Sequence, residues 1–63
     1  MNPDQKLIQS AYEDAIKQLY GTLRTSYTEA GGDPAQQQQA DQRFTAGVGL
    51  ARSSRDRAIE LLA

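Results

Sequence analysis

Side chains that could do chemistry are sparse along these 63 residues. The chain has no cysteine and no histidine, which removes the commonest nucleophile–base pairs and the commonest metal ligand. The eight acidic residues are scattered and never form the Glu-x-x-His pattern of di-metal sites in helical bundles. The serines, which have no histidine to activate them, are Ser10, Ser26, Ser53 and Ser54. We therefore expect no catalytic residues, no bound metal and no cofactor.

A second group of residues could contact nucleic acid. Arg52, Arg55 and Arg57 follow one another closely near the C-terminal end, and together they could form a positive patch for phosphate. Asp56 and Glu60 dilute this charge, which favours a solvated, salt-bridged helix face instead. RNA contact through the three arginines stays open as the alternative.

Arg55 differs from the other two arginines because it falls within an apolar seam. An unpaired buried charge is costly. The side chain could therefore lay its stem along the seam and bring its head out to water. It could instead pair with a carboxylate such as Glu13, or with one from a partner chain.

The elements that position these residues are organised around Ala30-Gly31-Gly32-Asp33-Pro34, close to the midpoint of the chain. Two glycines are poor helix formers and favour a helix end, whereas Asp33 suits an N-cap and Pro34 the first helical position. Short connections favour antiparallel neighbours. The sequence predicts an all-α, antiparallel two-helix hairpin in a single domain, with helices over residues 3–30 and 34–62 and a turn at 31–33.

The segment around Gly47-Val48-Gly49 is the weakest part of the second helix, because its glycines and β-branched residues together lower helix propensity by roughly 2–3 kcal/mol. It lacks the third glycine and the preceding strand of a dinucleotide loop. Small residues on one face let another helix approach closely, so we interpret them as a packing surface. These small residues are Gly47, Ala51, Ser54 and Ala58. A helix break near Gly47–Gly49 is the alternative.

A hairpin that turns at residue 32 places residue i opposite residue 64 − i. This register predicts that Leu19 packs against Phe44 and that Tyr12 lies over the stripe from Gly47 to Ala51. The apolar arc of the first helix is wider than one partner helix can cover, and leftover apolar surface marks an interaction site. The predicted interface residues are Leu7, Ile16, Tyr20, Tyr27, Leu50 and Leu61. Two hairpins packed as a four-helix bundle would cover them, as would a different helical protein.

Composition sets further expectations about location and partners. The formal net charge of −1 predicts no strong attraction to nucleic acid or to anionic membranes. The longest apolar stretch, from Ala46 to Ala51, is far too short to span a bilayer. Met1 is followed by Asn-Pro-Asp rather than by a basic and then an apolar segment, so we expect no signal peptide and a cytoplasmic protein.

The turn at Gly31-Gly32-Asp33 and the glutamine-rich start of the second helix resemble the small co-chaperones of type III secretion needle subunits. Those proteins are helical hairpins of similar length that bind a larger chaperone and help to keep the needle protein unpolymerised. The resemblance implies a helical protein partner, although Gly47 and Gly49 depart from the expected pattern. The length and layout also look like the Rop-type RNA-binding dimers, without a motif at residue level. Neither resemblance assigns a functional residue.

Overall fold

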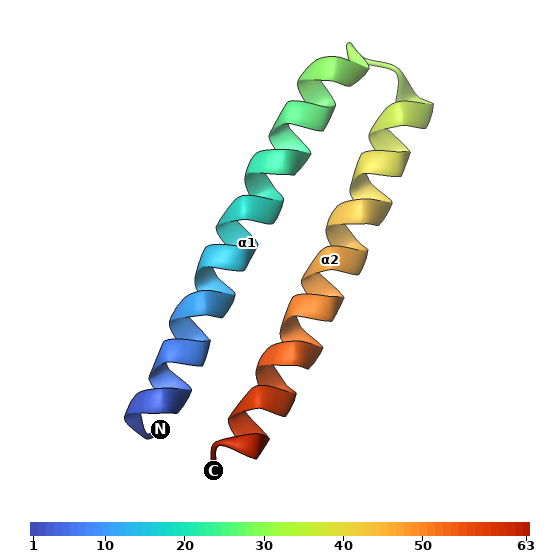
Figure 1. The fold of residues 1–63 in the computed structure, drawn as a ribbon. Helices are drawn as coiled ribbons and strands as arrows, with labels where there is room; N and C mark the ends of the chain where they lie inside the picture. The colour runs from blue at the N-terminus through green and yellow to red at the C-terminus, as the bar shows by residue number, and fades with distance from the viewer.

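The computed structural model describes residues 1–63 and consists of two antiparallel helices that lie side by side (Figure 1). Helix α1 spans Pro3–Ala30 and helix α2 spans Pro34–Leu61, with no strand. This confirms the predicted all-α hairpin, and α2 ends one residue before the predicted boundary. The two termini meet at the end of the molecule opposite the turn.

Each helix begins at a side-chain cap followed by proline. Asn2 Oδ1 accepts from the Gln5 amide at 2.8 Å, and Gln5 Oε1 accepts from the Asn2 amide at 3.0 Å, which together form a capping box. Asp33 Oδ1 accepts from the Ala35 amide at 3.0 Å at the start of α2. These caps satisfy backbone amides that have no partner within the helix.

The turn itself depends on its two glycines. Gly31 and Gly32 have φ angles of 58° and 89°, in a region that side chains with a β-carbon rarely adopt. The Asp33 amide donates to the Ala30 carbonyl at 3.0 Å and closes the turn. The local sequence therefore determines both the end of α1 and the start of α2.

Helix α2 is continuous through Gly47, Val48 and Gly49, so the alternative of a helix break there is wrong. Gly47 faces α1, and its missing side chain makes room for Leu19. Tertiary packing of this kind commonly outweighs a weak local propensity. The low helix propensity of the segment is thus compatible with an unbroken helix.

The pairing of the helices follows the predicted register at the open end of the hairpin. Asn2 Nδ2 donates to the Leu62 carbonyl at 2.8 Å, and Gln5 Nε2 donates to the Ile59 carbonyl at 3.0 Å. Towards the middle, Leu19 lines one hollow with Phe44, as the register predicts. Leu19 also rests on Gly47, which is three residues further from the turn than Phe44.

Tyr12 lies over the Ala51 end of the predicted stripe, where it lines one hollow with Ala51 and Ser54, whereas Leu19 covers the Gly47 end. Tyr12 also stacks beneath the guanidinium of Arg55. Side chains on a helix lean towards its N-terminus. In this antiparallel pair, the side chains of α1 therefore lean away from the turn, and the side chains of α2 lean towards it. A side chain of α1 can thus meet a residue of α2 whose backbone lies further from the turn than the residue directly opposite.

The core between the helices is thin. Only two residues of the 63 are buried, Ala30 and Ala40, and both lie near the turn. The Cα atoms extend over 45 × 15 × 9 Å along the three principal axes, so the molecule is a long slab one helix thick. Residues of the seam such as Leu19, Leu23 and Phe44 are only half-buried.

Candidate protein-interaction surface

The hairpin leaves large apolar side chains in solvent along its whole length. Leu50 is 71% exposed, Leu7 and Leu61 are each 68% exposed, and Tyr20 is 55% exposed. Tyr27 is also exposed, whereas Ile16 is half-buried. Two further large apolar residues, Met1 and Leu62, are exposed but were not among the predicted interface residues. Their positions at or next to a chain end could have indicated this exposure.

These residues divide between two opposite flanks of the hairpin. Tyr27 donates a hydrogen bond to Asp41, so the flank of α1 with Tyr27 adjoins the flank of α2 with Asp41. A helix turns by about 100° per residue, so Leu7 lies about 160° from Tyr27 around α1, and Leu50 and Leu61 lie roughly 160–180° from Asp41 around α2.

We call Leu7, Leu50 and Leu61 the leucine flank, and Ile16, Tyr20 and Tyr27 the tyrosine flank. A single flat partner cannot cover both flanks at once, because they project from opposite sides of a slab one helix thick. The distinction could have been drawn from the helical angles of the two helices, once antiparallel pairing was assumed.

An apolar groove runs beside the leucine flank, between α1 and α2. It has a volume of about 280 Å³ and is almost entirely apolar. We call it the alanine groove, and its lining residues are Ile8, Ala11, Tyr12, Ala15, Ala51, Ser54, Arg55 and Ala58. Leu50 borders the adjoining hollow together with Ala15 and Ser54. Leu7 lies one helical turn from Ala11, so the leucines flank the groove.

The tyrosine flank is more polar than the leucine flank. The Tyr27 hydroxyl donates to Asp41 Oδ1 and ties the two helices together near the turn. This hydrogen bond, with smaller effects of desolvation and of the Asp41 charge, raises the pKa of Tyr27 above its usual value. The Arg24 guanidinium lies 5.9 Å from the Tyr20 ring centre, which partly covers that ring.

The three arginines of the possible RNA patch are in different environments. Arg55 is half-buried, and its Nε and Nη2 atoms lie 2.9 and 2.8 Å from Asp56 Oδ1. Its partner is therefore the adjacent Asp56 and not the Glu13 that the sequence suggested. The guanidinium also lies 4.3 Å from the Tyr12 ring centre, which keeps it within the seam.

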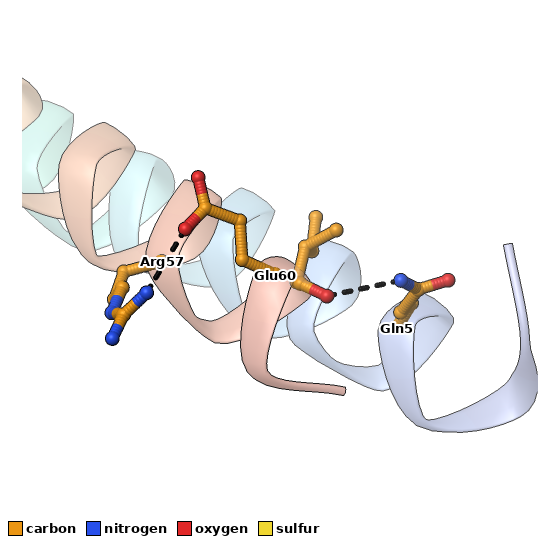
Figure 2. A network of polar contacts seen from close by, with 4 residues as sticks. Gln5, Arg57 and Glu60 are labelled. Atoms are coloured by element: carbon orange, nitrogen blue, oxygen red, sulfur yellow. Dashed lines mark hydrogen bonds and ion pairs between the residues drawn. The ribbon is translucent and has the colours of Figure 1, made fainter. Parts of the chain in front are cut away.

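Arg57 and Arg52 are both exposed. Arg57 Nη1 lies 3.0 Å from Glu60 Oε2, one helical turn away (Figure 2). Arg52 makes no ion pair within the chain. Two of the three arginines are thus held by carboxylates, so the positive charge available for phosphate is less than their number suggests.

Figure 2 also shows how the open end of the hairpin is joined. The Gln5 side chain of α1 points towards the end of α2, where its amide donates to the Ile59 carbonyl.

No group of three or more acidic, histidine or cysteine residues lies close enough together to hold a metal ion. Neither helix is sufficiently long and apolar to cross a bilayer.

Comparisons with protein-family models, with curated proteins and with solved structures gave no match to this chain. Any function must therefore be inferred from the residues and their arrangement. The most distinctive features of the surface are the two apolar flanks and the groove beside one of them.

Proposed function

We propose that this chain is a small protein–protein interaction module. It acts as a homodimer in the form of a four-helix bundle, or as a co-chaperone or adaptor for another helical protein. The observation that carries the proposal is the contrast between two buried residues, both alanine, and a series of exposed leucine and tyrosine side chains. An isolated hairpin with this distribution gains little from apolar burial, whereas an associated one gains much more.

The surface area supports association in quantitative terms. The hairpin exposes 4660 Å², whereas a compact monomer of 6.9 kDa exposes about 4,000 Å². The excess of roughly 700 Å² is close to the ~800 Å² that each partner loses in an interface of standard size. One interface per chain would therefore restore the surface that is usual for a protein of this mass.

The needle co-chaperone role suggested by the turn is one specific form of this proposal. It requires a helical partner that packs on the exposed flanks. The elongated hairpin offers such a partner a surface about as long as its own two paired helices. The Rop-like RNA-binding role would need free arginines instead. Because Arg55 and Arg57 are each engaged by a carboxylate, the structure gives the RNA role less support than the protein role.

Thermal unfolding at several protein concentrations tests the proposal. Association that stabilises the folded state makes the midpoint of unfolding depend on concentration. We expect the helical circular dichroism signal to melt at a higher temperature as the concentration rises, or as a purified helical partner is added. A cooperative melt with a constant midpoint over a hundredfold range, unchanged by any helical partner from the native host, would contradict the proposal.

A further inference from the structure

We infer that the leucine flank and the alanine groove form a self-complementary surface that binds a second copy of this chain, while the tyrosine flank stays outside that contact. This inference rests on the proposed function and names the face and the partner. An isologous interface uses the same patch on both subunits, so the patch must carry both the projecting groups and the spaces that receive them.

The leucine flank provides the projecting groups. Leu50 and Leu61 extend into solvent from α2, and Leu7 does so from α1. The alanine groove provides the spaces, because its floor and walls contain mainly alanine and serine side chains. Large side chains that meet small ones give the dense interdigitation found in protein interiors. Both halves of this arrangement lie on one side of the slab, as a two-fold contact requires.

Charge and area agree with a second copy as the occupant. No carboxylate lines the groove, and its one cation, Arg55, is already paired with Asp56. The groove itself therefore holds no unpaired charge that a second copy would have to bury. The excess surface of roughly 700 Å² per chain matches the loss expected for each subunit of a standard interface.

The tyrosine flank is less suited to this contact. Its two tyrosines already have polar partners in the hairpin, namely Asp41 for the Tyr27 hydroxyl and Arg24 for the Tyr20 ring. Covering this flank would desolvate those charged groups, which is costly unless they gain new partners. The groove carries a smaller cost of this kind, because its one charged lining residue, Arg55, is already half-buried and paired with Asp56.

The test compares charged substitutions on the two flanks by sedimentation equilibrium of the full chain. Leu50→Glu should weaken the dimer at least about tenfold, since a leucine is lost from each of two symmetric sites. Tyr20→Glu is the matched control, because Tyr20 is also an exposed apolar residue within a helix, and it should change the dissociation constant less than about twofold.

A second variant separates loss of contact from loss of folding. Ser54 is exposed at the edge of the groove, so Ser54→Trp should fill the space for a partner without a clash inside one hairpin. We expect a helical protein with weakened self-association. If the native chain dimerises and Tyr20→Glu disrupts it while Leu50→Glu and Ser54→Trp do not, the inference is overturned and the proposed function stands. A native chain that melts at a midpoint independent of concentration, with or without helical partners, overturns both.

Discussion

Leu19 of α1 lies directly on the backbone of Gly47 in α2. A β-carbon at position 47 would be only 2.6 Å from Leu19 Cδ2, closer than real β-carbons approach other atoms. At this contact a side chain of α1 reaches the backbone of α2, and this explains why a glycine is tolerated in the middle of α2. The other glycine of this segment, Gly49, has nothing within 4 Å of the corresponding position.

This difference predicts different outcomes for two similar substitutions. Gly49→Ala should stabilise the hairpin by about 1 kcal/mol, because alanine is the better helix former and the space is open. Gly47→Ala should stabilise it less, because the end of the Leu19 side chain must shift to make room for the new β-carbon. Urea unfolding followed by circular dichroism measures both, and equal stabilisation by the two variants would show that Leu19 moves aside without cost.

The turn and the helices could be predicted from the sequence because the signals there are local. Gly31, Gly32 and Asp33 act within a few residues of their own positions, and the caps and φ angles are as the residue types require. The contacts between the helices depend on how side chains lean along each helix, which residue spacing alone does not show. For this reason the hairpin was predicted correctly, whereas the stacking of Tyr12 on Arg55 and the contact of Leu19 with Gly47 were not predicted.

Arg55 shows a second limit of sequence reasoning. Glu13 was a reasonable partner by register, but the adjacent Asp56 can reach the guanidinium while Tyr12 keeps it in the seam. The division of the exposed residues into two flanks was accessible from helical angles. It required comparing the angular positions of the apolar residues around both helices together, because their positions around one helix do not show which flanks adjoin.

The stacking of Arg55 on Tyr12 predicts an energetic coupling between these residues. A cation over an aromatic face contributes about 0.5–1 kcal/mol when exposed and about 2 kcal/mol when desolvated, and Arg55 is half-buried. A double-mutant cycle with Tyr12→Leu and Arg55→Met should therefore give a coupling free energy of about 1 kcal/mol. Effects of the two substitutions that simply add would mean that the stacking does not stabilise the fold.

The Gln5 amide provides a prediction for the open end of the hairpin. Gln5→Glu keeps the oxygen that accepts from the Asn2 amide but removes the donor to the Ile59 carbonyl. Loss of this part-buried hydrogen bond should lower the free energy of unfolding by about 1 kcal/mol. Gln9→Glu is the control, because this substitution makes the same change of charge about one helical turn later. The Gln9 side chain forms no hydrogen bond to α2. Equal losses in the two variants would assign the effect to charge rather than to the bond.

The hydrogen bond from Tyr27 to Asp41 predicts a contribution to stability that depends on pH. Because the pKa of Tyr27 is raised in the folded chain, this contribution is fully present below the pKa of an unfolded tyrosine, about 10. It is lost as the pH rises through the higher pKa of the folded state. Asp41→Asn should lower the pKa of Tyr27, as followed by the absorbance of tyrosinate.

Tyr27→Phe identifies which of the three tyrosines is responsible. The phase that titrates at the highest pH should be missing from this variant, and its stability should fall less between neutral and alkaline pH than that of the native chain. If the high phase persists in Tyr27→Phe, another tyrosine carries the raised pKa.

The measurement that tests the central claim most directly is the mass of the purified chain by sedimentation equilibrium at neutral pH over a range of concentrations. The exposed flanks and the thin core predict a reversible dimer with twice the 6.9 kDa mass of one chain. A helical species that stays at 6.9 kDa at every concentration, and that still unfolds cooperatively, would contradict the claim that this hairpin is half of a larger bundle.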